Sequence, residues 1–99
     1  MKYRVRYTKE ARDDLKRLYA FLLARDLQVA KDALAAIIKA VDSLRGFPFT
    51  ARRAPGGDAF LRELIIPFAS AGYVALFQIK DATTVNILAV RHQREDDYR

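Results

Sequence analysis

Cationic side chains gather at the C-terminal end of this 99-residue sequence. The group consists of Arg91, His92, Arg94 and Arg99. His92 is the single histidine of the chain, and an imidazole ordinarily has a pKa of about 6.5, which suits proton transfer at neutral pH. Tyr98 adds an aromatic face, so the segment suits contact with nucleic acid or with an acidic protein groove. The alternatives are a hydrogen-bonded surface histidine and a solvated tail that acidic residues 95–97 partly neutralise.

Arg62 is a second cationic candidate, and it lies in an alternating segment typical of a strand. It shares strand parity with Phe60, Leu64 and Ile66, which predicts an aliphatic stem along an apolar face and a guanidinium at its edge. We interpret Arg62 as a clamp for a phosphate or a carboxylate. The structural alternative pairs it with the aspartates at 96–97, since burial of a lone arginine needs a partner.

The composition excludes several classes of site. Without cysteine, the chain has neither disulfides nor thiolate zinc ligands, and its one histidine rules out an imidazole metal cluster. No glycine-rich phosphate-binding motif occurs, so we expect neither a metal nor a cofactor. The 18 lysines and arginines exceed the 12 acidic residues, and the net charge of +6 favours an acidic partner, either nucleic acid or protein. The alternative is that this charge serves solubility alone.

The N-terminal residues MKYRVRY alternate charged and apolar side chains, unlike the apolar core of a signal peptide. No apolar run approaches the roughly 18 residues that a membrane-spanning helix needs. We therefore expect a cytoplasmic protein with no membrane partner. Its length suits a single domain over residues 1–99, built around one core.

Two helices are predicted after an N-terminal strand at residues 2–7. Thr8 is a suitable N-cap for the first helix, and apolar residues recur at the helical period as far as Leu22. Asp26 is a suitable N-cap for the second helix. The short separation near residues 24–27 predicts that the helices form an antiparallel hairpin.

The second helix is predicted to end near Arg45, with Gly46 as a left-handed cap residue. Residues 48–59 contain proline and glycine without an apolar period, which predicts a surface loop. This loop exposes Arg52 and Arg53, either as contacts for a partner or as solubilising charges.

From residue 60 the apolar period changes to two, which predicts strands at residues 60–66, 72–79 and 84–91. The strand 72–79 is apolar on both faces, as in a central strand. Turns at 67–72 and 80–83 join the three into an antiparallel meander. We therefore predict an α+β domain in strand–helix–helix–three-strand order. Its helical hairpin packs on a small, twisted and mainly antiparallel sheet.

Four motifs follow this order of elements. The opening Y-x-V-x-Y-T-x-E-A-x-x-D-L starts at Tyr3, and F-L-R-E-L contains Arg62. The aromatic strand G-Y-V-A-L-F starts at Gly72, and the basic ending I-L-A-V-R-H-Q-R-E starts at Ile87. Their order and spacing resemble the ParE/RelE toxin superfamily over essentially the whole chain.

The resemblance implies a toxin that a co-expressed antitoxin neutralises by wrapping the toxin's surface, so we expect a hetero-oligomer of the two. We expect the antitoxin to cover the helix pair and to add to an edge of the sheet. RelE-like members cleave messenger RNA in the ribosome, whereas ParE-like members block DNA gyrase and are not known to cleave anything. In a RelE-like enzyme, the phosphate-binding and proton-transfer groups would be Arg62, His92, Arg94 and Tyr98.

The lysine pattern separates the two mechanisms. The most active RelE members place lysines just before the second strand, whereas residues 47–61 contain Arg52 and Arg53 but no lysine. Arginine is a poor general base because its pKa stays above about 12. We therefore expect a non-enzymatic gyrase inhibitor. The alternatives are a ribosome-dependent messenger RNA endoribonuclease and a non-toxic member that only binds its antitoxin. The expected partner contacts are Arg52, Arg53, Arg62, Arg91 and Arg94.

Overall fold

A strand, two long helices and a run of strands make up residues 2–94, the part of the chain that the computed structural model describes. The helices are α1 (Lys9–Leu23) and α2 (Leu27–Asp42). The strands are β1 (Arg4–Tyr7), β2 (Arg52–Arg53), β3 (Leu61–Phe68), β4 (Ala71–Ile79) and β5 (Thr84–His92). Two short 3-10 helices, Ser43–Arg45 and Pro48–Thr50, lie between α2 and β2.

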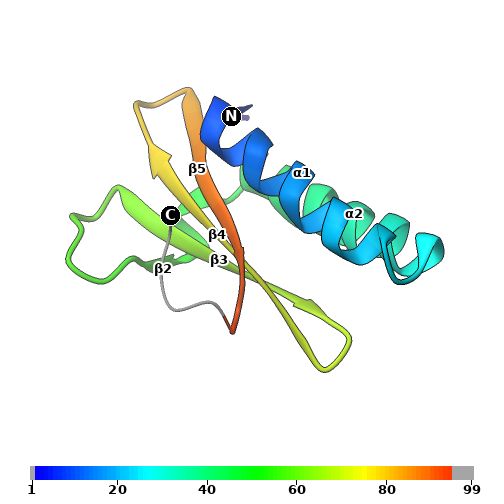
Figure 1. Cartoon of the computed structure of the whole chain (residues 1–99). Helices are drawn as coiled ribbons and strands as arrows, with labels where there is room; N and C mark the ends of the chain where they lie inside the picture. The colour runs from blue at the N-terminus through cyan, green and yellow to red at the C-terminus, as the bar shows by residue number, and fades with distance from the viewer. Residues whose placement is uncertain (1, 95–99) are drawn as a thin grey trace.

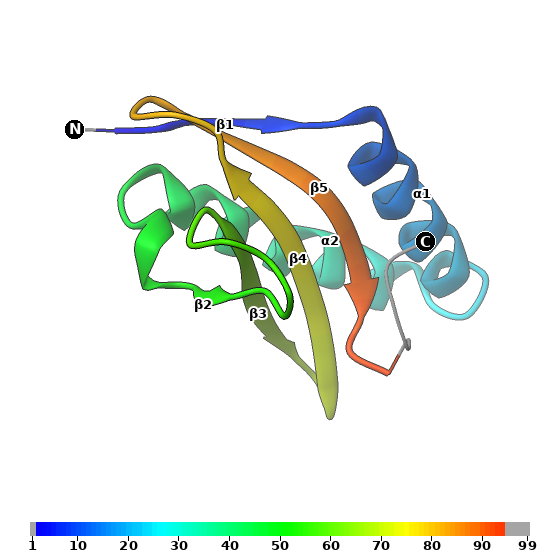
Figure 2. The same ribbon diagram turned by 90° about the vertical axis from the view of Figure 1, so that its left-hand side faces the viewer.

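The strands form one sheet in the order β1-β5-β4-β3-β2. β3, β4 and β5 form an antiparallel meander, whereas β1 lies parallel to β5, with Tyr7 opposite Ile87. Figure 1 shows α1 and α2 as a hairpin over one face of this sheet, and Figure 2 shows β1 running beside β5. The predicted α+β architecture is therefore confirmed, and the first and last strands of the fold are neighbours.

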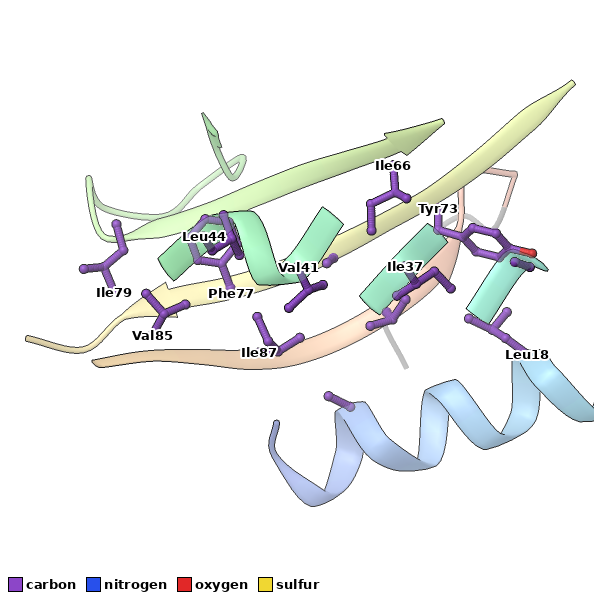
Figure 3. Packing of buried hydrophobic residues seen from close by; sticks show 14 residues of the cluster. Leu18, Ile37, Val41, Leu44, Ile66, Tyr73, Phe77, Ile79, Val85 and Ile87 are labelled. Atoms are coloured by element: carbon purple, nitrogen blue, oxygen red, sulfur yellow. The ribbon is translucent and has the colours of Figure 1, made fainter. Parts of the chain in front are cut away.

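The hydrophobic core fills the space between the hairpin and the sheet (Figure 3). Leu18 from α1 and Ile37 and Val41 from α2 are buried there, as their helical spacing predicts. Phe77 and Ile87 meet them from the sheet and are fully buried. Burial of these side chains is the main favourable contribution to folding, since it removes apolar surface from water.

Side-chain caps begin both helices at the predicted residues. Thr8 Oγ1 accepts a hydrogen bond from the Ala11 N–H at 3.1 Å, and the Thr8 hydroxyl donates to the Ile87 carbonyl at 3.0 Å. Asp26 Oδ1 accepts from the Val29 N–H at 3.1 Å. Each cap satisfies a backbone donor that the first helical turn leaves unpaired. Thr8 also joins the start of α1 to β5.

A further contact between α1 and β5 was not predicted from the sequence. β1 ends opposite Ile87, so the remaining part of β5 lacks a neighbouring strand on that side. Asp14 Oδ2 accepts a hydrogen bond from the Val90 N–H at 2.9 Å, and Val90 is fully buried. The carboxylate of a helix thus satisfies a buried strand amide.

The segment after the second helix differs from the prediction. α2 ends at Asp42, and the chain continues in a 3-10 turn to Arg45. Gly46 has a φ of −99°, so the predicted left-handed cap is wrong. The Gly46 N–H instead donates to the Ser43 carbonyl at 3.2 Å, which closes a tight 3-10 turn.

Residues 48–59 contain more regular structure than the predicted surface loop. A 3-10 turn spans Pro48–Thr50, and β2 pairs with β3 so that Arg52 lies opposite Glu63. A two-residue strand is too short to produce an alternating pattern, which is why the sequence gives no signal for it. The predicted exposure of Arg52 and Arg53 is confirmed.

The hairpin turn between β3 and β4 is shorter than the predicted turn at 67–72. β3 continues through Pro67 to Phe68, and β4 begins at Ala71. Ala69 adopts the left-handed conformation with a φ of 52° in this turn. Proline is compatible with a strand where its missing N–H faces no partner, and β2 covers only the first part of β3. The prediction was wrong because it assigned proline to the turn.

Candidate functional site

Arg62 anchors the segment before β3 through backbone carbonyls. Its Nη1 donates to Ala51 at 2.8 Å and to Phe49 at 3.0 Å, and its Nε donates to Ala59 at 2.8 Å. The guanidinium also lies 5.3 Å from the centre of the Phe49 ring. The predicted pairing with aspartates 96–97 lies outside the described residues. This geometry favours a structural role for Arg62 over an open clamp, because its Nη1 and Nε already donate to three backbone carbonyls.

Arg52 and Arg53 differ in what they contact. Arg52 Nη2 lies 2.8 Å from Glu63 Oε1, and Glu63 is only 3% exposed, whereas the Arg52 side chain is 57% exposed. This ion pair attaches β2 to β3 and leaves part of the guanidinium accessible. Arg53 is exposed and makes a long hydrogen bond of 3.4 Å to the Gly57 carbonyl. The sequence reasoning missed Glu63 because β2, which brings its partner, was not predicted.

Arg91 and His92 point to opposite faces of β5. Successive strand residues alternate, and His92 lies opposite Tyr73, a core residue on the helix side, while Arg91 lies opposite Val74. The His92 and Tyr73 rings meet edge to face, with centroids 5.5 Å apart. His92 Nδ1 accepts a hydrogen bond from the Arg94 N–H at 3.1 Å. The structure therefore brings His92 and Arg94 together on the helix side and places Arg91 on the other face.

Two of the residues considered for RNA cleavage, Arg62 and His92, lie far apart along the sheet. Arg62 lies opposite Phe77 and His92 lies opposite Tyr73, four residues away along β4. At about 3.3 Å per residue, that is a separation of roughly 13 Å. Tyr98 lies outside the described residues. The described part of the chain thus offers a His–Arg pair at one end of the sheet and an engaged arginine at the other.

A groove of about 620 Å³ lies beside His92, between the connected ends of α1 and α2 and the turn joining β3 to β4. Figure 1 shows both connections projecting from the same side of the molecule. The apolar lining consists of Leu18, Phe21, Leu22, Val29, Phe68 and Tyr73. Aromatic rings form a row along it, since the Phe68 and Tyr73 centroids are 6.2 Å apart and His92 follows. Burial raises the pKa of Tyr73 above its ordinary value, which keeps its phenol neutral.

Three arginines surround this apolar lining, and the sequence reasoning missed two of them. Arg17 comes from α1, Arg25 from the turn between α1 and α2, and Arg94 follows β5. The Arg25 guanidinium lies 4.7 Å from the centre of the Phe21 ring. The spacing signal was present, because Arg17 and Phe21 are four residues apart and so share one face of α1, and Arg25 follows at the same spacing just after the helix ends. Pairing the acidic and basic residues of the first helix by their spacing does not reveal this cationic group.

Neither a metal site nor a membrane segment emerges from residues 2–94. No three His, Asp or Glu side chains of this range are grouped so that they could hold a metal ion. Neither of the two described α-helices is long and apolar enough to cross a membrane.

Known proteins share both the sequence pattern and the fold. A family described as "ParE toxin of type II toxin-antitoxin system, parDE" matches residues 5–97. A chain of the chromosomal ParDE system from P. aeruginosa is similar with a TM-score of 0.75 and 20% identity, covering 92% of this chain and 96% of that chain. A chain of the RelBE2 toxin–antitoxin complex from Mycobacterium tuberculosis has a TM-score of 0.64 and 26% identity, covering 94% and 100%. The chain matches none of the curated proteins. Because the family match extends over nearly all of its length, this chain belongs to the ParE toxin family of type II toxin–antitoxin systems.

Proposed function

We propose that this chain is a toxin that binds and inhibits DNA gyrase in the cytoplasm and that a cognate antitoxin neutralises it. The observation that carries the proposal is the ParE family match over residues 5–97. The superfamily resemblance assigns gyrase to the ParE-like branch, and inhibition by binding requires no catalytic group. A binding surface is then the functional site of the molecule.

The arrangement of the cations supports binding rather than RNA cleavage. Cleavage through 2′-OH attack requires a base, an acid and phosphate-binding cations around one phosphate. Arg62 donates to three carbonyls and lies roughly 13 Å along the sheet from His92, at about 3.3 Å per strand residue. Arg94 is close to His92, but a guanidinium is a poor general base.

The proposed partner contacts are arginines on two parts of the surface. Arg52 and Arg53 are exposed on the edge strand β2, whereas Arg91 is partly buried near the end of β5 and exposed Arg94 follows that strand. We assign Arg62 an indirect role, since its hydrogen bonds position the segment that carries β2. Together with the net charge of +6, these side chains favour acidic surfaces on gyrase and on the antitoxin.

Exposed apolar side chains and open strand edges support an antitoxin partner. Phe21, Leu27 and Ile38 of the hairpin are each about half exposed, at 59%, 51% and 49%. Among the strands of residues 2–94, β1 has a neighbour only on its β5 side, so its other edge is a candidate for pairing with an extended segment. The similar chains come from a chromosomal ParDE toxin–antitoxin system of P. aeruginosa and from a RelBE2 toxin–antitoxin complex of M. tuberculosis.

A RelE-like messenger RNA endoribonuclease is the second candidate function. It is favoured by the position of His92 and Arg94 in one groove, where the Arg94 N–H donates to His92 Nδ1 at 3.1 Å, because an imidazole and a guanidinium are groups that RNA cleavage can use. The likeness to the RelBE2 complex, at 26% identity, supports the same alternative.

Expression of the chain alone in bacterial cells distinguishes the two functions. A gyrase inhibitor should cause filamentation and a DNA-damage response while messenger RNA stays broadly intact. The same gene with an early stop codon controls for the burden of expression. Growth arrest with codon-positioned cuts in messages, and without a DNA-damage response, would contradict the proposal.

A further inference from the structure

The charged side chains of the groove beside His92 carry one sign. Arg17, Arg25 and Arg94 contribute cations, and within residues 2–94 no aspartate or glutamate belongs to the lining. Arg17 lies 3.7 Å from Asp14, but its side chain is 50% exposed and so remains accessible to a ligand. Three cations around one groove favour a ligand with several negative charges, and guanidinium groups bind phosphates especially well.

Aromatic rings lie beside these cations. Phe21 is 59% exposed, and the Arg25 guanidinium lies 4.7 Å from the centre of its ring. The Phe68 and Tyr73 rings, with centroids 6.2 Å apart, belong to the same lining. A flat heterocyclic ring can stack on such aromatic surfaces, as nucleic-acid bases do in proteins that bind single strands. The groove therefore suits a ligand that carries a planar ring next to a group of negative charges.

The size of the groove also fits a small organic ligand. Its volume is about 620 Å³, and pockets for small molecules ordinarily measure roughly 300–1,000 Å³. Ser70, at the turn between β3 and β4, adds an exposed hydroxyl that can donate or accept a hydrogen bond.

We propose that this groove binds a nucleoside triphosphate. The base stacks against Phe21 or the Phe68–Tyr73 rings, and the phosphates pair with Arg17, Arg25 and Arg94. Stacking is available to every base, so the ligand class includes any base. Arginine side chains hold the phosphates here in place of the backbone amides of a glycine-rich loop. A sequence without such a loop therefore gives no sign of this ligand.

Calorimetric titration of the full chain with ATP tests the proposal, with adenosine and inorganic triphosphate as partial ligands. A chelator keeps magnesium away from the phosphates. ATP should bind at one site, and each partial ligand should bind about tenfold or more weakly, because it makes only one of the two kinds of contact. The affinity for ATP should fall several-fold between about 0.05 M and about 0.5 M salt.

His92 provides a reporter of the binding position without any substitution. It is the single histidine of the chain and belongs to the lining of the groove, so its imidazole proton resonances are identified without ambiguity. These resonances should shift on addition of ATP and saturate at the concentrations that calorimetry gives. ATP binding without any change at His92 would place the nucleotide elsewhere and overturn the proposal.

Two groove variants and two matched controls test the contacts. Phe21→Ala and Arg25→Glu should each weaken ATP binding by about tenfold or more, since one removes a stacking surface and the other reverses a phosphate-binding charge. Phe47→Ala removes a phenylalanine that is 72% exposed outside the lining, and Lys39→Glu reverses an exposed charge in the last turn of α2. Both controls should bind ATP as the unchanged chain does. Thermal unfolding verifies the fold of each variant, and Arg25→Glu remains informative if Phe21→Ala is unstable.

Several outcomes would overturn the proposal. Equal affinities for ATP and inorganic triphosphate would make the groove a site for anions alone. Equal losses in Arg25→Glu and Lys39→Glu would mean that the net charge of the chain, and not the groove, attracts ATP. An oligonucleotide of about eight thymidines that binds more tightly and displaces ATP would make a nucleic-acid strand the occupant. Self-association that Phe21→Ala abolishes would make a second copy of the chain the occupant. Nucleotide binding and gyrase inhibition are measured separately, so either can fail without the other.

Discussion

Arg62 is the residue whose interpretation changes most between sequence and structure. As a clamp it would bind a partner directly, whereas its bonds to Phe49, Ala51 and Ala59 predict a role in stability. Arg62→Lys keeps the charge but removes the planar guanidinium that donates to three carbonyls, so the free energy of unfolding should fall by about 1.5–3 kcal/mol. Arg53→Lys should change it little, because Arg53 makes one long contact. Urea denaturation measures both, and an unchanged midpoint for Arg62→Lys would show that its hydrogen bonds do not support the fold.

Substitution of His92 distinguishes a toxin that acts by binding from one that acts by catalysis. The ring packs against Tyr73 and accepts a hydrogen bond from the Arg94 N–H, and neither contact requires proton transfer. His92→Ala should therefore leave toxicity largely intact when compared at equal protein levels. In a ribonuclease that uses His92 as acid or base, the same change would lower cleavage by about 10²- to 10⁴-fold. Loss of toxicity with an unchanged melting temperature would count against the binding mechanism.

The packing of α1 on β5 depends on Asp14 as well as on apolar contacts. Asp14→Ala would leave the buried Val90 N–H without its acceptor, which should lower the free energy of unfolding by about 1–3 kcal/mol. Asp13→Ala is the matched control, because its carboxylate contacts only exposed Lys9 at 2.9 Å. Thermal or urea unfolding should separate the two variants clearly. Similar midpoints would mean that water replaces the Asp14 carboxylate at no cost.

The sequence predicted the elements that carry a clear period and missed those that depend on distant pairing. Apolar residues that recur about every 3.6 residues predicted both helices, and apolar residues that alternate predicted the three long strands. Thr8 and Asp26 were correctly predicted as the residues that begin the helices. β2 is only two residues long and depends on its pairing with the distant strand β3, so no local pattern reveals it. For the site, the sequence located the cations but not the groove, which forms only when the hairpin meets the β3–β4 turn.

The whole molecule places two cationic surfaces at different parts of one sheet. Arg52 and Arg53 lie on the β2 edge, while Arg94 borders the groove at the end of β5. With a net charge of +6, such a molecule attracts acidic partners over distances comparable to the Debye length, about 8 Å at physiological salt. The same charge promotes non-specific DNA binding, so any test of gyrase inhibition must separate the two effects.

Supercoiling of relaxed plasmid by purified gyrase, with increasing amounts of the purified chain, tests the proposed function most directly. Two controls test for DNA coating: relaxation of the supercoiled form of the same plasmid by topoisomerase I, and the gyrase reaction with a small basic protein of similar charge in place of the chain. The account predicts that supercoiling by gyrase falls while topoisomerase I continues to act and the basic control has no effect. Unchanged supercoiling, accompanied by codon-positioned cuts in ribosome-bound messages when the chain is added, would contradict it.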